Sequence, residues 1–517
     1  MVNKAIFKTY LGKFLPGTDT KNREGAPAYK MGPREALAQY AVTGTFNGTF
    51  YADGAEQLEA IRALALEVEP EFLAKVAIYA AEHGHMKDMP VTLLAILSWL
   101  DSEIFARAFP RVIKSGKMLR GFVQVMRSGA TGRKSLGTRP KKLVEAWIEQ
   151  ASTAQFMRAM VGNDPSLADV IRMVHPKPAT AERKALYAWA IGRPYDYEAL
   201  PVLVKQFEAF KRNQASAVPD VPFQLLTALP LKRNHWTAIA RKGSWQMVRQ
   251  NLNTFARKGV FEETGMTALI ARQMADPEQI RKAKVFPYQL MMAWKMVDRT
   301  VPEKVRDALE DAMEVAIRNV PEVPGRVVLC PDVSGSMASP VTGYRKGATT
   351  QVRCIDVAGL MTAAFLRRNQ TARVLPFENA VVPVDLHRRN SVMTNAAKLA
   401  NIGGGGTNCS APLKMLADER AEVDLVVFIS DNQSWVDARP KGQPTGMMAE
   451  WARIKRLNPA ARLVCLDIQP YETTPIEAGP EVLAIGGFSD AVFTAIAAFA
   501  SGKRGDHWAN TIEAIDL

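Results

Sequence analysis

The stretch that decides the fold of the second part of this chain is residues 327–336, VVLCPDVSGS. The apolar run Val327–Cys330 is typical of a buried strand, and after Pro331 comes an Asp-x-Ser-x-Ser loop at Asp332–Ser336. Open α/β sheets bind ligands at the carboxyl ends of their strands, where this loop would lie. One carboxylate and two hydroxyls in a tight turn can direct oxygen atoms at a hard cation such as Mg²⁺. The loop is therefore predicted to form part of a metal site.

Two further loops strengthen this prediction, because chance alone would produce the Asp-x-Ser-x-Ser pattern in about one chain in ten. Gly403–Gly406 precedes Thr407, and the strand-like run Leu425–Ser430 ends at Asp431. This order resembles the metal-ion-dependent adhesion site of von Willebrand factor A domains. We expect Mg²⁺ or another divalent cation to be bound by Asp332, Ser334, Ser336, Thr407 and Asp431. The alternative is that Gly403–Gly406 is only a linker and Asp431 only a turn residue.

Residues 321–517 alternate between short apolar runs and helical stretches, which indicates an α/β domain with a parallel sheet. The predicted strands are Arg326–Cys330, Ala372–Phe377, Val423–Ile429, Leu463–Asp467 and Val482–Ile485. The predicted helices are Ile355–Arg368, Ser391–Asn401, Pro412–Ala417, Met447–Leu457 and Asp490–Ala500. The Pro-rich junction Pro321–Gly325 is the predicted boundary between a domain of residues 1–320 and one of residues 321–517.

Residues 30–320 show helical spacing of apolar side chains again and again, with almost no strand-like alternation. Asp53 and Glu56 form a capping-box pattern, and Asp276 before Pro277 predicts another helix start. Further helices are predicted at Met89–Leu100, Leu143–Gln150, Ala181–Ile191, Tyr197–Phe210, Ser244–Arg257, Pro287–Met296 and Glu303–Asn319. Such paired helices suit an all-α solenoid, although the sequence shows no strict internal repeat.

The net charge of +14 lies entirely in the first part of the chain. Residues 1–320 hold 46 Lys and Arg against 32 Asp and Glu, a difference of +14, whereas residues 321–517 hold 20 of each. Two stretches, 104–144 and 221–261, contain basic residues and no acidic one. A charge run is often only a solvated helix face. Two such runs beside a neutral second part favour a surface that binds a polyanion.

Composition is that of an ordinary globular protein, with 47% hydrophobic and 23% charged residues in a chain of 517. The cysteines lie apart without any Cys-x-x-Cys pattern, which predicts free thiols in a reducing compartment. They are Cys330, Cys354, Cys409 and Cys465. No secretory signal and no run of 18 apolar residues is present in the sequence. We therefore expect a cytoplasmic protein.

A basic helical part followed by an adhesion-type metal domain resembles the Ro autoantigen family, whose helical part is the TROVE module. Its short landmarks match Gly129–Arg133, Trp147, Val174–Pro178 and Phe286–Tyr288. One departure is Lys134–Pro140, which is longer and richer in Gly and Pro than in the animal proteins. The resemblance implies HEAT-like helical repeats closed into a ring, with the von Willebrand factor A domain joining the ends.

The resemblance also implies a function. Ro proteins bind small noncoding Y RNA on an outer basic surface and single-stranded 3′ ends of misfolded RNA in a central hole. Bacterial members can act with polynucleotide phosphorylase. By position, Arg158, Asn163 and His175 match family residues near the hole, and local charge adds Arg133, Lys134, Arg172 and Lys177. For His175, the structural alternative is a buried histidine beside a Pro-Lys-Pro turn.

The sequence is compatible with three functions to different degrees. The sequence favours a noncatalytic RNA-binding protein in RNA quality control. The second is a metal-dependent adhesion scaffold, in which an acidic protein ligand completes the Mg²⁺ shell, and it could coexist with the first. An enzyme is disfavoured, because the sequence has no phosphate-binding loop, no His-Glu-x-x-His motif and no Ser/His/Asp motif. A single Mg²⁺ held by Asp332 and Asp431 also offers no evident base or second metal for hydrolysis.

Overall fold

The structure is a computed structural model that describes residues 15–213, 217–283, 285, 287–344, 352–477, 479–487, 490–501 and 508–517. The described residues fall into two compact units. One lies within Met1–Val68, Phe286–Met292 and Met313–Ile515, and the other within Glu69–Val285, Ala293–Ala312 and Asp516–Leu517. The domain boundary at residues 321–325 remains a prediction. Residues up to Val68 belong to the same compact unit as the α/β part. Phe286 of the Phe286–Tyr288 landmark lies outside the described residues.

The second unit is helical throughout its described residues. Its elements are α3 (Pro70–Glu82), α4 (Asp88–Leu100), α5 (Ser102–Val112), α6 (Gly116–Ser128), α7 (Thr138–Gln150), α8 (Thr153–Ala159), α9 (Leu167–Val174), α10 (Ala181–Ala190), α11 (Val202–Arg212), α12 (Phe223–Leu226), α13 (Arg233–Lys242), α14 (Trp245–Gln250), α15 (Leu252–Arg257), the 3₁₀ turn η1 (Val260–Glu262), α16 (Met266–Ala275) and α17 (Pro277–Ala283). Helices α18 (Pro287–Met296) and α19 (Glu303–Ala316) have residues in both units.

Neighbouring helices of this unit pack on one another as the helical spacing predicts. Helix α3 packs on α4 and α5, and α6 packs on α4, α8 and α9. Between α5 and α6, the rings of Phe105, Phe109 and Phe122 lie with centroids 5.4 to 5.9 Å apart. Edge-on and offset aromatic contacts of this kind add to the free energy of burial. The helices are thus held by side chains from successive segments.

Three predicted helix boundaries in this unit are wrong. The helix predicted from Leu143 begins earlier, at Thr138. The helix predicted from Tyr197 begins at Val202, because Pro201 stands at its N-cap and residues before it do not continue a helix. The helix predicted at Ser244–Arg257 is two helices, α14 and α15, which meet at Asn251 with φ −118° and ψ 12°. The Asp276 N-cap is confirmed, since its carboxylate accepts from the N–H groups of Glu278 and Gln279.

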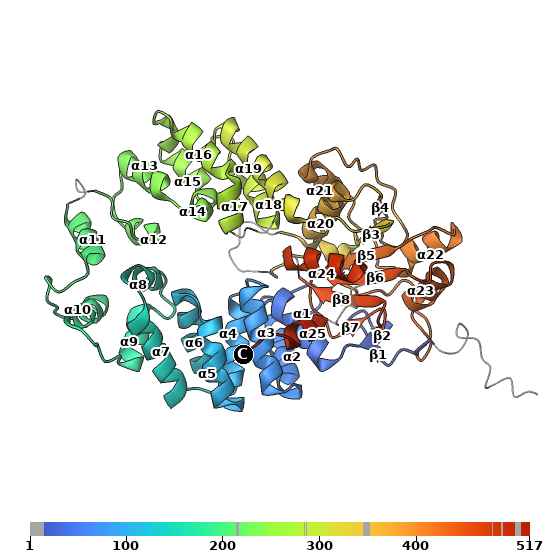
Figure 1. The fold of residues 1–517 in the computed structure, drawn as a ribbon, viewed down its shortest axis with the longest axis horizontal. Coiled ribbons are helices and arrows are strands. Elements are labelled where there is room, and N and C mark those ends of the chain that lie inside the picture. The colour runs from blue at the N-terminus through green and yellow to red at the C-terminus, as the bar shows by residue number, and fades with distance from the viewer. Residues whose placement is uncertain are drawn as a thin grey trace, which may run out of the picture. The chain divides into compact units, whose positions relative to one another are not determined.

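The α/β unit contains a parallel sheet of five strands among its described residues, in the order β4-β3-β5-β6-β8 (Figure 1). The strands are β3 (Val327–Pro331), β4 (Arg373–Val374), β5 (Leu425–Ser430), β6 (Arg462–Asp467) and β8 (Val482–Gly486). All five predicted strands are therefore present, with β4 shorter than expected. The chain reverses its direction of winding between β3 and β5. In sheets of this order, ligands bind where the carboxyl ends of two such strands diverge.

Helices cover both faces of this sheet. One face packs α22 (Ser410–Asp418) and α23 (Gly446–Leu457) against a core that includes Cys330, Phe428 and Cys465. Helix α20 (Cys354–Arg368) packs on β3, β4 and β5, and the ring of its Phe365 meets Phe493 of α24 (Asp490–Ala500). Helix α21 (Val392–Ala400) packs on α20, and the 3₁₀ turn η3 (Gly335–Ala338) begins within the Asp332–Ser336 loop. The predicted α/β domain with a parallel sheet is confirmed.

The segment up to Val68 contributes two strands and one helix that the sequence did not predict, together with the helix predicted after Asp53. Strands β1 (Thr20–Lys21) and β2 (Pro27–Lys30) form a small antiparallel sheet with β7 (Thr473–Thr474). Helices α1 (Pro33–Thr43) and α25 (Trp508–Glu513) pack on each other and on β8, and α2 (Gly54–Glu67) packs on α1. Strands of two to four residues carry too little alternation to be recognised, and their partner is remote in sequence.

The four cysteines are free, as their spacing predicted, and all four are buried. Within the described ranges, none of the helices has the length and apolar character needed to cross a bilayer. The 3₁₀ turn η2 (Ile317–Asn319) ends the predicted helix Glu303–Asn319, of which α19 is the α-helical part.

Candidate metal centre and basic surface

The predicted metal loop lies at the carboxyl end of β3, buried with its polar atoms directed inward. Asp332 is 0% exposed and Ser334 is 1% exposed. The Asp332 carboxylate accepts the Ser334 N–H at 2.8 Å through one oxygen and the Ser430 hydroxyl at 2.5 Å through the other. The hydroxyl oxygens of Ser334 and Ser336 lie 3.3 Å apart. Two hydroxyls are thus gathered in one place, and Asp332 is held by β5 as well as by its own loop.

The glycine loop is docked on the metal loop, so the reading of Gly403–Gly406 as a linker is wrong. The N–H of Gly335 donates to the carbonyl of Gly405 at 3.1 Å, and the N–H of Gly404 donates to Val333 at 3.1 Å. Gly404 has φ +145° and Gly405 has φ +59°, which side-chain-bearing residues rarely adopt. The glycines therefore let two backbones meet closely. Thr407, which is 1% exposed, follows directly.

Asp431 completes the set at the end of β5. It is 2% exposed, and its Oδ2 is a buried atom without a hydrogen-bond partner. Burial, followed by the charge of Asp332, raises the pKa of Asp431 to about 7. Burial also raises the pKa of Asp332. The next residue, Asn432, has a left-handed backbone with φ 55°, so Asp431 is a buried carboxylate and more than a turn residue.

These residues fit a hard divalent cation. Two buried carboxylates with raised pKa values, one with an unpartnered oxygen, are stabilised by a nearby positive charge. Ser334, Ser336 and Thr407 supply the neutral oxygen ligands that Mg²⁺ accepts, while Asp332 and Asp431 can orient the shell. Among the described residues, no cluster of three His, Cys, Asp or Glu side chains could hold a metal. The candidate site therefore depends on its hydroxyls.

Several residues around this centre were not predicted from the sequence. Ser430 directly precedes Asp431, and its position at a strand end was the one signal that could have marked it. Asp467, at the end of β6, is 4% exposed and accepts the Gln39 amide of α1 at 2.6 Å. Burial, with the charge of Asp431 as the next cause, raises the pKa of Asp467 well above its usual value. Gln39 and Asp467 are remote in sequence, so no local pattern links them.

Asp467 gives a testable pH dependence in metal-free protein. Because the pKa of Asp467 is raised in the folded state, the ionisation of this carboxyl lowers the free energy of unfolding as the pH rises above the unfolded-state pKa of about 3.9. Asp467→Asn removes that charge and keeps an oxygen for Gln39. We expect this variant to be more stable than the parent by about 1–3 kcal/mol near pH 8, and equal near pH 4. Thermal unfolding in EDTA measures this, with the exposed Asp385→Asn as control. Equal stabilities at both pH values would contradict it.

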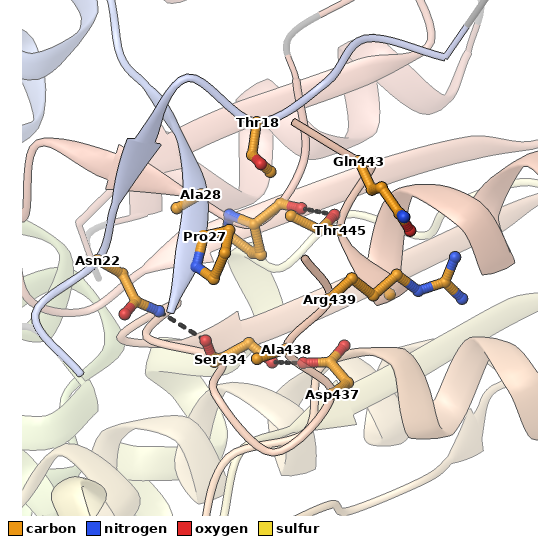
Figure 2. A pocket seen from close by; sticks show the side chains of 12 residues that line it. Thr18, Asn22, Pro27, Ala28, Ser434, Asp437, Ala438, Arg439, Gln443 and Thr445 are labelled. Carbon is orange, nitrogen blue, oxygen red and sulfur yellow. Dashed lines mark hydrogen bonds between the residues drawn. The ribbon is translucent and has the colours of Figure 1, made fainter. Parts of the chain in front are cut away.

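A small pocket lies beside the centre, between the β1–β2 hairpin and the loop after Asp431 (Figure 2). Figure 2 shows Asn22 reaching Ser434, at 2.6 Å from its amide nitrogen to the Ser434 carbonyl. The Ser434 hydroxyl donates to Asp437 at 2.5 Å. The pocket has room for about one water molecule. The pocket is therefore a small packing gap between the hairpin and the loop, and it offers no space for an organic ligand.

The predicted RNA-binding residues lie on α8, α9 and the loops beside them. Arg158 lies on α8 and Arg172 on α9, while Asn163 lies between these helices. Arg133 and Lys134 occupy the loop between α6 and α7. Of the seven predicted RNA-binding residues, Arg133 is half-buried and the other six are exposed. Because α6 packs on both α8 and α9, these residues belong to neighbouring elements of one unit.

His175 ends α9 with a left-handed backbone, φ 52°, and its N–H donates to Ile171 at 2.9 Å. Its side chain is exposed. The alternative of a buried, satisfied histidine is therefore wrong. Within the described ranges, Arg158, His175 and Lys177 form no ion pair and no side-chain hydrogen bond, whereas Arg172 donates to Asp169 and Ile191. The chain turn after α9 thus presents groups that can bind an outside anion.

Part of the acid-free stretch 104–144 has structural roles. Arg111 pairs with Glu82 at 2.7 Å, and Arg139 pairs with Glu103 at 2.5 Å. The buried Arg120 donates to the backbone oxygens of Val161 and Pro165, and burial lowers its pKa. Arg120 therefore fixes the loop that carries Asn163. The exposed cations of this stretch without an ion pair to Asp or Glu among the described residues are Arg107, Lys117, Arg127, Lys134 and Lys142.

Some basic residues of the second stretch, 221–261, also have partners within the protein. Arg233 pairs with Glu262 and Glu263. Lys258 lies over the Trp236 ring at 5.7 Å, and Arg249 lies over Trp245 at 5.9 Å. Lys258 is exposed, whereas Arg249 is buried and cannot reach an anion in solvent. The number of basic residues in a stretch thus overstates the charge that is free to bind a polyanion.

The comparisons with known proteins agree with this architecture. Residues 326–500 match the family model of the Ro60 vWA domain, so the α/β unit contains a von Willebrand factor A domain that is similar to that of Ro60. Over 534 residues, the chain is 23% identical to RNA-binding protein RO60 of Deinococcus radiodurans, covering 95% of this chain and 96% of that protein. It is 24% identical to RNA-binding protein RO60 of Caenorhabditis elegans over 275 residues, which are 50% of this chain and 40% of that protein.

The fold is similar to a solved structure. The crystal structure of Deinococcus radiodurans RO (RSR) protein matches with a TM-score of 0.60 and 21% identity, covering 91% of this chain and 100% of that one. The resemblance to the Ro family is confirmed, as is the fold class of a helical part followed by a von Willebrand factor A domain.

Proposed function

We propose that this protein binds RNA through its helical unit and holds Mg²⁺ at a separate site in its α/β unit. One observation carries the first part: Arg158 on α8 and Lys177 after α9 are exposed cations without an acidic partner among the described residues, in the part of the chain that holds the whole excess charge of +14. Lys and Arg side chains bind phosphates without regard to sequence and release counterions. The names of the relatives, both RNA-binding proteins, support the same assignment.

The finer proposal follows the Ro resemblance. Small Y RNA would bind the outer basic surface, and single-stranded 3′ ends of structured or misfolded RNA would bind at Arg133, Arg158, His175 and Lys177. One strand can lay its phosphates along a narrow basic wall, while an A-form duplex is too broad to do so. The protein would act in cytoplasmic RNA quality control, without catalysis of its own, and hand RNA to an exonuclease such as polynucleotide phosphorylase.

The RNA affinity of the full-length protein should fall steeply with salt. We expect a log-log slope of roughly 0.7 for each phosphate contacted on a single strand, and several such contacts. Replacing Lys134 and Lys177 together by Ala should reduce the slope by about 1.4, because two contacts are lost. Filter binding over a salt series measures it. The exposed pair Arg388 and Arg389 of the α/β unit, replaced by Ala, is the matched control. Binding that ignores salt, or equal losses in both double variants, would refute the assignment.

A second function, capture of an acidic protein ligand at the Mg²⁺ site, has its own observation. Trp435 is 42% exposed and Val436 is 38% exposed, and the backbone N–H groups of both donate to the carbonyl of Thr407. Large apolar side chains held at the rim of a metal site are the kind of surface that protein partners bury. A carboxylate of the partner would complete the shell of the ion. This function can coexist with RNA binding because it uses other residues.

A further inference from the structure

A cleft of about 430 Å³ lies between the ends of α22 and α23, two helices of the α/β unit that pack side by side (Figure 1). These helices lead into the first residues of β5 and β6, so the cleft lies where the parallel strands begin. The predicted metal loop lies at the opposite edge of the sheet, where the strands end. The cleft is therefore separate from the metal centre. It is lined by Ala417, Asp418, Arg420, Arg453, Arg456 and Leu457.

The walls of this cleft are held in place by contacts between the two helices. Arg453 of α23 pairs with Asp418 of α22 at 2.7 Å and with Glu450 of its own helix at 2.6 Å. Asn458, directly after α23, donates to the carbonyl of Ala421, which follows α22, at 3.0 Å. The cleft is thus preformed, which lowers the entropy lost when a ligand binds.

Two of the three arginines in the cleft can bind an anion. Arg420 and Arg456 are exposed, and they form no ion pair and no side-chain hydrogen bond among the residues that the structure describes. The lining holds three arginines and one aspartate, a net charge of +2, whereas residues 321–517 as a whole are neutral. Guanidinium groups bind carboxylates through paired hydrogen bonds. The cleft therefore favours an anionic ligand.

Arg420 also stands at a position where the backbone favours glycine. Its φ is +53°, directly after the end of α22, and its N–H donates to the Ala417 carbonyl at 3.2 Å. Helices often end with a left-handed residue, which is usually Gly because a side chain is strained there. Strained residues cluster at binding sites, and Arg420 lines this cleft. The strain is thus a second indication that its side chain has a use.

We propose that this cleft binds an acidic peptide segment of a partner protein, independently of Mg²⁺ and of RNA. Carboxylates of the segment pair with Arg420 and Arg456, and an apolar side chain packs on Leu457, which is 37% exposed. Clusters of arginine are a common means of recognising acidic motifs. An RNA strand fits less well, because Asp418 and Glu450 repel its phosphates and the cleft takes only a few side chains.

The test measures binding of a fluorescein-labelled peptide of sequence EELEE to the full-length protein by fluorescence anisotropy. EDTA is present, so that no carboxylate can bind through a metal ion. Replacing Arg420 by Gly and Arg456 by Gln together should weaken binding about 10-fold, because two charged contacts are lost. The matched control replaces the exposed Arg388 and Arg389 of the same unit by Gln and should bind as the parent does. The uncharged peptide QQLQQ should bind more weakly than EELEE.

Single variants separate binding from folding. Arg420→Gly should melt at or above the temperature of the parent, because glycine relieves the left-handed backbone, while its affinity for EELEE falls about threefold. Arg456→Gln, which leaves that backbone unchanged, should lose affinity to a similar extent. A parent that does not bind EELEE, or cleft variants that bind it as the parent does, would overturn the proposal. If a short oligouridylate displaces EELEE more effectively than unlabelled EELEE does, the cleft belongs to RNA and the proposal is equally wrong.

Discussion

Asp332→Ala should abolish Mg²⁺ binding and leave RNA affinity within about twofold of the parent protein. The carboxylate joins the metal loop to β5, through the Ser334 N–H and the Ser430 hydroxyl, so its loss frees the hydroxyls that would hold the ion. Removing a residue that orients a metal shell lowers affinity by about 10- to 100-fold, and Asp332 also supplies charge, so the loss should reach the upper end or beyond. Calorimetry with Mg²⁺ and filter binding with RNA measure the two affinities.

Two further variants guard against a trivial loss of folding. Asp332→Asn retains an acceptor for the Ser334 N–H and should also lose Mg²⁺, while its melting temperature in EDTA shows whether the unit is folded. Asp385→Ala removes a fully exposed aspartate from the same unit and should bind Mg²⁺ normally. A folded Asp332→Ala protein that loses RNA and keeps metal would show that the two sites have been assigned the wrong way round.

Replacing Arg158 and His175 together by Ala should erase the preference for RNA with a single-stranded 3′ tail. In the parent, a duplex with such a tail should bind more tightly than the same duplex with a blunt end. The two exposed side chains can contact the phosphates and bases of one strand, and base stacking alone contributes about 1–3 kcal/mol per base. We therefore expect the preference to fall about 10- to 100-fold. Competition binding with tailed and blunt duplexes measures it.

The same double variant should bind Y-like RNA nearly as well as the parent, because the outer surface would rely on other cations of stretches 104–144 and 221–261. Arg456→Ala with His387→Ala removes the same two side-chain types from the α/β unit and is the matched control. Parallel weakening of tailed and Y-like RNA by the Arg158 and His175 changes would indicate one solvated basic face. It would rule out a separate site for 3′ ends.

The main lines of the fold could be predicted because their causes are local. The apolar run Val327–Cys330 and its four companions became the parallel sheet, since burial on both faces requires continuous apolar strands. The capping box at Asp53 and Glu56 formed as predicted, because all its hydrogen bonds lie within one helical turn. The β1-β2-β7 sheet could not be predicted, because its short strands are stabilised by a partner more than 400 residues away.

For the candidate sites, sequence determined the chemistry that is available and tertiary structure decided how it is used. The Asp-x-Ser-x-Ser loop after a buried strand was enough to predict an oxygen-rich centre, because strand ends meet at one edge of a parallel sheet. Only the folded chain shows Ser430 holding Asp332, and Gln39 of α1 donating to Asp467. It also shows that Arg111 and Arg120 of a uniformly basic stretch are occupied by Glu82 and by backbone oxygens. Charge is a property of the sequence, whereas its availability depends on partners that only folding brings within reach.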